Sequence, residues 1–141
     1  GDVVDYALIK ARLEELDRMY DVRFFCADQW HLEILRQQFG PEIQRKFVEI
    51  PQTIAGQALG TGELERLFRA KEISHPPNPL GRWCFGNAIV HVDGNENKKL
   101  MKNKSIERID PMVALVNAMA GVIKSGYKPN VYEQRGMLSL G

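Results

Sequence analysis

The stretch VRFFCADQWHLEILRQQFGPEIQRKFVEI, residues 22–50, decides the fold class of this chain. Residues 22–28 form a short, mostly apolar run, which is typical of a buried strand of the parallel type. Residues 29–40 carry apolar side chains at helical spacing and end at a Gly-Pro pair, which predicts a helix. Residues 46–50 are a second short strand, and the spacing of apolar residues predicts an amphipathic helix over roughly residues 4–20, capped by Asp2 or Asp5. The order helix, strand, helix, strand predicts an α/β fold with a parallel strand pair and a right-handed crossover.

The remainder of the chain continues in short elements. We expect residues 51–62, PQTIAGQALGTG, to be a loop or a loosely helical link, and residues 63–73 to be an amphipathic helix. Residues 74–83 are rich in proline and lead into a short helix near residues 80–88. Alternation in AIVHVD, followed by the turn signal DGNENK and by KLMK, predicts a hairpin, and a final helix begins at Asp110.

Length and composition indicate one soluble globular domain over residues 1–141, with a flexible tail from about residue 128. Hydrophobic residues make up 44% and charged residues 26%, and the net charge is only +1, so the overall charge identifies no partner. No apolar stretch approaches the length of a membrane span, and no signal peptide is evident. Cys26 and Cys84 lack metal-site spacing and are expected to be free, buried thiols.

Several common site motifs are absent from the sequence. The glycines of GQALGTG are followed by neither Lys-Ser nor Lys-Thr, so this is not a P-loop, and the dinucleotide fingerprint also fails. The three histidines, His31, His75 and His91, form no HExxH pair and no zinc spacing with cysteine. There is no GxSxG nucleophile elbow. These observations exclude the simplest nucleotide-binding, zinc-binding and serine-hydrolase interpretations.

Two aspartates occupy positions at which carboxylates often act. Asp28 ends an apolar strand just before a helix, which is the edge of an open α/β sheet where ligands bind. Asp110 precedes Pro111 at the start of a helix, whose N-terminus favours an ionised carboxylate. Rigid, ionised carboxylates suit Mg²⁺ or Mn²⁺. Each aspartate can equally be a helix cap, and spacing alone leaves both interpretations open.

A basic cluster precedes the last helix. Residues 98–108 contain five basic residues and one acidic residue, Glu107. The basic residues are Lys98, Lys99, Lys102, Lys104 and Arg108. Such a cluster can contact phosphates. It can also be the solvated surface of a hairpin, and the sequence alone does not decide between the two.

Three segments, in order, resemble the C-terminal nuclease domain of bacteriophage terminase large subunits, the motors that package DNA into capsids and cut it. The first is residues 1–30, ending in FFCADQW. The second is residues 63–90, with a His, then Asn-Pro, a Trp and an Asn, and the third is residues 97–120, with a lysine-bearing stretch followed by Ile-Asp and an alanine-rich helix. The resemblance covers roughly residues 1–125.

The resemblance implies a ribonuclease H-like mixed sheet flanked by helices and a Mg²⁺- or Mn²⁺-dependent endonuclease that cleaves double-stranded DNA with two metal ions. Asp28 matches the second catalytic acid and Asp110 the last, and we expect them to converge on one site. Asn87 and Lys104 match supporting positions near that site, and a structural role is expected for His75, Asn78 and Trp83. Lys98, Lys99, Lys102 and Lys104 would contact the DNA backbone.

The family's first catalytic aspartate lies on a strand before the first helix of this chain. We therefore expect an N-terminally truncated domain, inactive by itself and with an exposed sheet edge. The resemblance also implies the terminase small subunit, the portal and the procapsid as partners, and the cytoplasm of the bacterial host as the location. Two alternatives are a non-catalytic DNA- or protein-docking module and another ribonuclease H-like enzyme such as a transposase or resolvase.

Overall fold

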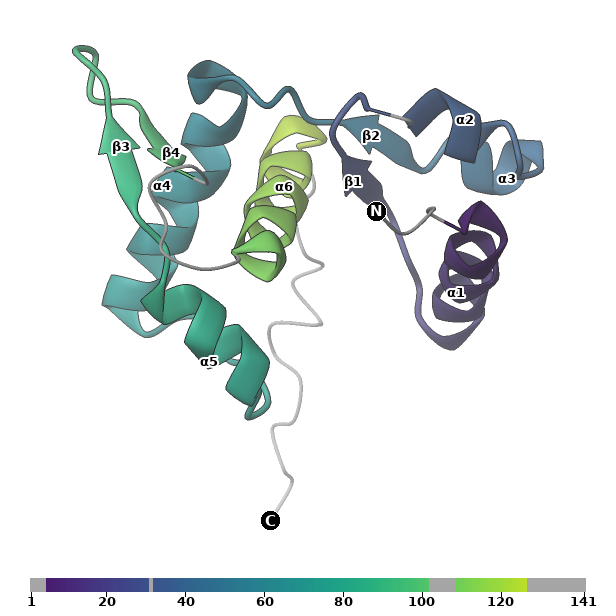
Figure 1. Cartoon of the computed structure of the whole chain (residues 1–141), viewed down its shortest axis with the longest axis horizontal. Helices are drawn as coiled ribbons and strands as arrows, with labels where there is room; N and C mark the ends of the chain where they lie inside the picture. Colours follow the sequence, from purple (N-terminus) through teal and green to yellow (C-terminus); the bar gives the residue numbers. More distant parts are fainter. Residues whose placement is uncertain (1–4, 31, 102–108, 127–141) are drawn as a thin grey trace, which may run out of the picture.

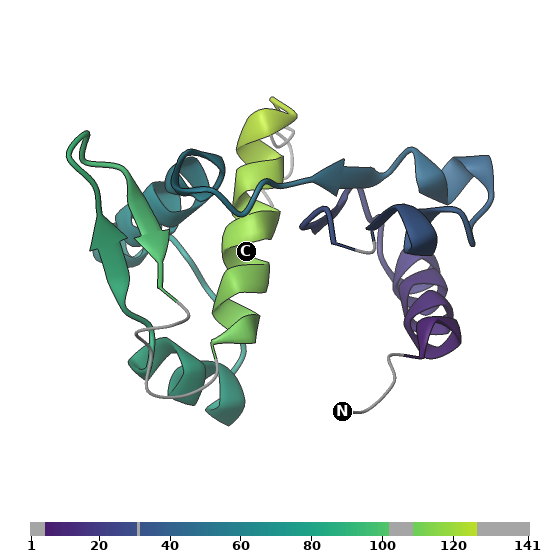
Figure 2. The same ribbon diagram turned by 45° about the horizontal axis from the view of Figure 1, so that its top comes forward.

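The computed structural model describes residues 5–30, 32–101 and 109–126. Figure 1 shows α6 between two groups of elements, and Figure 2 shows the same arrangement from a second direction. One group contains α1, α2, α3 and the strands β1 and β2; the other contains α4, α5 and the hairpin β3–β4. The elements are α1 (Tyr6–Met19), β1 (Phe25–Ala27), α2 (Leu32–Arg36), α3 (Pro41–Gln44), β2 (Phe47–Glu49), α4 (Ile54–Ala70), α5 (Pro79–Gly86), β3 (Val90–Val92), β4 (Lys98–Leu100) and α6 (Asp110–Lys124).

The predicted parallel strand pair is confirmed. β1 and β2 pair in parallel, with Phe25 opposite Phe47 and Ala27 opposite Glu49. The rings of Phe25 and Phe39 each lie 5.4 Å from the ring of Phe47, so aromatic packing fixes the pair against the following helices. The helix predicted over residues 29–40 is shorter than expected, since α2 covers Leu32–Arg36, and a separate short helix, α3, begins at Pro41.

The expected single mixed sheet is not present in the described part of the chain. The hairpin strands β3 and β4 pair antiparallel with each other, as predicted, but they form a two-stranded sheet separate from β1–β2. The fold is therefore a mixed α/β arrangement in which helices, chiefly α4 and α6, supply most of the packing surface.

Helix α1 is confirmed, and Asp5 caps it by accepting hydrogen bonds from the backbone N–H groups of Ala7 and Leu8 at 2.9 and 3.3 Å. None of its side chains is fully buried. The Lys46 ammonium lies 2.5 Å from the Asp17 carboxylate, and the Lys10 ammonium lies over the Phe39 ring. Charged contacts therefore join α1 to the segments around the strand pair, beside its half-buried apolar side chains.

For residues 51–62 the sequence predicts a loop or a loosely helical link. The loop alternative is wrong, because α4 begins at Ile54 and includes most of that segment as regular helix. Thr53 caps the helix by accepting from the Gly56 N–H at 3.0 Å. The glycines that suggested a loop serve packing instead. A Cβ built on Gly60 would lie 2.4 Å from the Val116 carbonyl oxygen, so α4 and α6 approach backbone to backbone at this point. Tertiary packing overrides the low helix propensity of glycine here.

The main hydrophobic core lies between α4, α5, α6 and the hairpin. Its buried members come from segments distant in sequence: Leu64, Cys84, Leu100, Ile109, Met112 and Val116. Both cysteines are free, as predicted, with Cys84 buried and Cys26 half-buried. Burial raises the pKa of the Cys26 thiol. Across the described residues, no helix combines the length and apolar character that crossing a membrane requires.

The hairpin turn is organised by Asp93. Its carboxylate accepts hydrogen bonds from the backbone N–H groups of Asn95 and Asn97, both at 2.9 Å, and from the Asn97 side-chain amide at 3.0 Å. Glu96 adopts a left-handed conformation with φ of 61° that closes the turn. Hydrogen bonds from Asn97 lower the pKa of Asp93, with smaller contributions from Asn95 and His91.

Replacing Gly60 by alanine should destabilise the chain by about 1–3 kcal/mol, because the added methyl group meets the backbone of α6. Gly62→Ala is the matched control: nothing lies within 4 Å of its Cβ position, so this change in the same helix should stabilise by roughly 0.5–1 kcal/mol. Urea unfolding of the two variants measures both effects. A stabilising Gly60→Ala would show that the helices do not touch there.

The lowered pKa of Asp93 predicts a pH-dependent hairpin. The contribution of Asp93 to stability is fully present above the ordinary aspartate pKa and is lost as the pH falls through its lower folded value. Cross-strand nuclear Overhauser effects between Val90 and Leu100 should therefore weaken below about pH 4. Asp93→Asn, which does not titrate, should remove this pH dependence; an unchanged acid transition in the variant would assign it to another group.

Candidate metal site at the strand ends and the start of α6

Asp28 lies at the carboxyl end of β1, immediately after Ala27. It is half-buried, and one carboxylate oxygen accepts a hydrogen bond from the Trp30 N–H at 3.0 Å. This bond shapes the turn that leads from β1 toward α2. Asp28 therefore forms the turn that is expected of an aspartate at this position. The hydrogen bond from Trp30 keeps its half-buried carboxylate at the end of the strand.

Asp110 is the first residue of α6 and is exposed. The N-cap position belongs to Ile109, which is 0% exposed, so the cap interpretation of Asp110 is wrong, and Pro111 takes the second helical position rather than the first. Ile109 and Met112 are both core residues. They anchor the start of α6 on either side of Asp110, and the carboxylate is mounted on a backbone that packing holds still.

The rotation of α6 turns Asp110 toward the strand pair. Asp110, Asn117 and Lys124 are spaced seven residues apart and therefore lie along one face of the helix. The Lys124 ammonium donates to the Glu49 carbonyl at 3.2 Å, and the Gln52 side-chain amide donates to the Asn117 side-chain oxygen at 3.5 Å. Asp110 occupies the same face, about two turns before Asn117.

The contacts place the strand pair beside the second half of α6. Glu49 contacts Lys124, Gln52 contacts Asn117, and Cys26 of β1 lies against Gly121. Asp28 follows β1 by one residue, and Asp110 begins the first half of α6. Within the described ranges no three His, Cys, Asp or Glu side chains are grouped to hold a metal ion, and the pairing of the two aspartates on one ion stays a prediction.

The hairpin lysines have partners inside the molecule. The Lys98 ammonium pairs with the Glu65 carboxylate of α4, and the Lys99 ammonium donates to the Gln52 carbonyl. Hydrogen bonds from Lys98 and then Arg69 lower the pKa of Glu65. Lys102 and Lys104 lie outside the described residues. The sequence predicted the basic cluster, but it did not indicate that Glu65 of α4 would pair with Lys98.

The other positions named by the resemblance have local structural roles. Asn78 caps α5 by accepting from the Gly81 N–H at 3.0 Å, and the His75 ring lies 2.9 Å from the Pro76 carbonyl. Trp83 remains 46% exposed on α5. Asn87 is the C-cap of α5, and its side-chain nitrogen is buried without a hydrogen-bond partner among the described atoms. The structure thus assigns structural contacts to Asn78 and His75, as expected.

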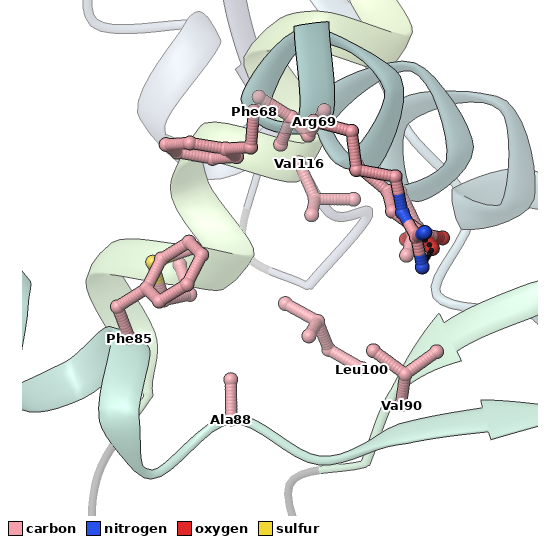
Figure 3. A pocket seen from close by; sticks show the side chains of 11 residues that line it. Phe68, Arg69, Phe85, Ala88, Val90, Leu100 and Val116 are labelled. Atoms are coloured by element: carbon pink, nitrogen blue, oxygen red, sulfur yellow. Dashed lines mark hydrogen bonds and ion pairs between the residues drawn. The ribbon is translucent and has the colours of Figure 1, made fainter. Parts of the chain in front are cut away.

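The chain also contains an apolar cavity of about 220 Å³ between α4, α5, α6 and the hairpin. Figure 3 shows Phe68, Phe85, Leu100 and Val116 around it, with the charged end of Arg69 at one side. Phe68 and Phe85 pack edge to face across it, with ring centroids 4.9 Å apart. Neither predicted site aspartate lines this cavity, so it is distinct from the candidate metal site.

Sequence reasoning missed a buried set of side-chain amides beside the candidate site. Gln57 is 1% exposed and Asn117 is 6% exposed. The Gln57 amide nitrogen lies 3.4 Å from the Asn117 side-chain oxygen and 2.9 Å from the Gln52 side-chain oxygen. Gln52 and Gln57 fall in the segment expected to be a loop, so nothing in the sequence pattern marked them as buried.

Comparisons with known proteins agree on one family. Residues 1–125 match the family model of the terminase large subunit, endonuclease domain. The large terminase subunit of Enterobacteria phage HK97 is 29% identical over 116 residues, covering 82% of this chain and 23% of that protein. The crystal structure of the HK97 large terminase superposes with a TM-score of 0.77 at 28% identity, covering 86% of this chain and 26% of that one. The chain thus spans about a quarter of the length of these relatives, and it belongs to the terminase large-subunit endonuclease domain family.

Proposed function

We propose that this chain is the metal-dependent endonuclease part of a phage terminase large subunit that cleaves double-stranded DNA during packaging. The observation that carries the proposal is the match of residues 1–125 to the endonuclease domain family, together with the similarity to the HK97 large terminase structure. This membership replaces the transposase or resolvase alternative. We further propose that the complete domain has a ribonuclease H-like fold, of which β1 and β2 form one part.

We assign Asp28 and Asp110 as ligands of Mg²⁺ or Mn²⁺. The donor chemistry fits, because hard divalent cations take carboxylate oxygens plus water and phosphate oxygens. Core packing of Ile109 and Met112 holds the start of α6, which carries Asp110, and the turn after β1 holds Asp28 in place. When bound, a pair of such ions supplies activation of water and stabilisation of the leaving oxygen. The role of these two residues is to hold and orient the cation.

We propose that the 141-residue chain, with Asp28 and Asp110 as its acidic ligands, binds metal weakly and cleaves DNA poorly or not at all by itself. Lys98, Lys99, Lys102 and Lys104 are proposed to contact phosphates, which position a duplex without reading its sequence. For the whole protein we propose the small subunit, the portal and the procapsid as partners, and the host cytoplasm as location.

A non-catalytic docking module is the remaining alternative. The contacts of Lys98 and Lys99 favour this alternative, because both ammonium groups already have partners within the chain. The two functions differ in metal binding, because a docking module has no need of a cation held by Asp28 and Asp110.

In a full-length terminase large subunit carrying this chain, Asp28→Asn and Asp110→Asn should each reduce DNA cleavage more than the roughly 10–100-fold caused by losing an outer-shell residue. The fold should survive, since Asn keeps the size of the side chain, and circular dichroism checks this. Asp21→Asn is the control. Asp21 is exposed, and among the ion pairs of the described residues it pairs only with Arg23. Cleavage that survives both substitutions would reject the assignment.

Calorimetric titration of the 141-residue chain with Mn²⁺ separates the nuclease from the docking module. Binding that weakens in Asp28→Asn and in Asp110→Asn, but not in Asp21→Asn, supports the metal site. Mn²⁺ binding that is insensitive to both aspartates would favour the docking module.

The pairing of Lys98 with Glu65 predicts that Glu65 competes with DNA phosphates. Glu65→Gln should tighten duplex binding at low salt and steepen the dependence of log K on log salt concentration by about 0.9 for each additional phosphate that the protein neutralises. Glu63→Gln is the matched control, since it removes the same charge from α4 but pairs with Arg66 rather than with the hairpin. Fluorescence anisotropy measures both. Equal effects of the two variants would indicate general charge repulsion and no role for Lys98.

A further inference from the structure

The strand pair meets α6 at a face that lies outside the main core. The main core lies on the other side of α6, against α4, α5 and the hairpin. On the strand side, the contacts include the approach of Cys26 to Gly121, the Lys124 bond to Glu49, and the amides that join Gln52 to Asn117. Apolar packing is non-directional and would permit α6 to turn or slide. Something else must fix the face that α6 presents to the strands.

The buried amides are placed to do this. The Asn117 oxygen accepts from two donors, the side-chain amides of Gln52 and Gln57, at 3.5 and 3.4 Å. The Gln57 amide also donates to the Gln52 oxygen at 2.9 Å, so the three side chains form a closed set. The Lys99 ammonium donates to the Gln52 backbone carbonyl and extends the set to the hairpin. We call Gln52, Gln57 and Asn117 the amide cluster.

Burial makes the hydrogen bonds of the amide cluster a strong constraint on the orientation of α6. Gln57 and Asn117 are almost fully excluded from solvent, so a rotation of α6 that broke their bonds would leave polar groups without water or protein partners. A single buried amide can set the register of packed helices for the same reason. The close approach at Gly60, one turn from Gln57, leaves little room for α6 to adjust by other means.

We propose that the amide cluster fixes the rotation and register of α6 against α4 and the segment that links β2 to α4, which makes Gln52, Gln57 and Asn117 positioning residues for Asp110. Asp110 lies on the same face of α6 as Asn117, so a turn of the helix at Asn117 would turn the Asp110 carboxylate with it. The part of this inference that concerns metal rests on the proposed function; the part that concerns α6 does not.

The test uses the 141-residue chain and the variant Asn117→Leu, which nearly keeps the size of the side chain and removes the oxygen that accepts both hydrogen bonds. Gln57→Met is a second variant, in case the first does not fold. Leu64→Val is the matched control, because Leu64 is buried in the main core and is not part of the amide cluster. The first measurement is made without metal, by nuclear Overhauser effects between Cys26 and Gly121 and between Glu49 and Lys124.

In Asn117→Leu or Gln57→Met these effects should shift to neighbouring α6 residues or be lost, whereas Leu64→Val should lower the melting temperature and leave them in place. The second measurement is the Mn²⁺ dissociation constant, expected to rise at least about tenfold in the cluster variants and to stay unchanged in the control. Unchanged Overhauser effects and unchanged Mn²⁺ binding in both cluster variants would overturn the inference. Shifted effects in a chain whose Mn²⁺ binding is insensitive to both Asp28→Asn and Asp110→Asn would uphold the role of the amide cluster and reject the proposed metal site instead.

Discussion

The contact between α4 and α6 at Gly60 is the constraint on which the rest of the structure depends. Because the two backbones nearly touch, the distance between α4 and α6 is fixed at this point. The core residues of the hairpin and of α5 pack against these two helices. The opposite face of α6 then meets the strand pair. One residue without a side chain thus sets the distance between α4 and α6, the two helices around which the other elements pack.

The parts of the fold that the sequence predicts well are those in which local pattern and tertiary role agree. Residues 22–50 are such a case, because two apolar strands flank a periodic segment and a Gly-Pro step, and the parallel pair is confirmed. The first half of α4 is the opposite case. Its glycines favour a loop locally, and only the approach of α6 makes glycine the residue that fits, so no single-sequence pattern could predict that helix.

The candidate site divides in the same way. Asp28 and Asp110 could be named from their places at a strand end and a helix start, and from the family resemblance, although Asp110 is not the cap that its position suggested. The amide cluster could not be predicted, because Gln and Asn are ordinarily exposed and the burial of Gln57 and Asn117 follows from the packing of α4 against α6, which no local pattern indicates. The pairing of Lys98 with Glu65 was also out of reach, since it joins residues 33 positions apart.

Helix α1 differs from the other long helices in having no fully buried side chain, while the Lys46–Asp17 pair and the Lys10–Phe39 contact join it to the strand pair. Ion pairs of this kind weaken as salt screens them, whereas the core around α6 does not depend on them. Helix α1 is therefore expected to loosen before the core around α6 when salt screens these pairs. Limited proteolysis in concentrated salt would then cut at α1 before the hairpin or α6 opened.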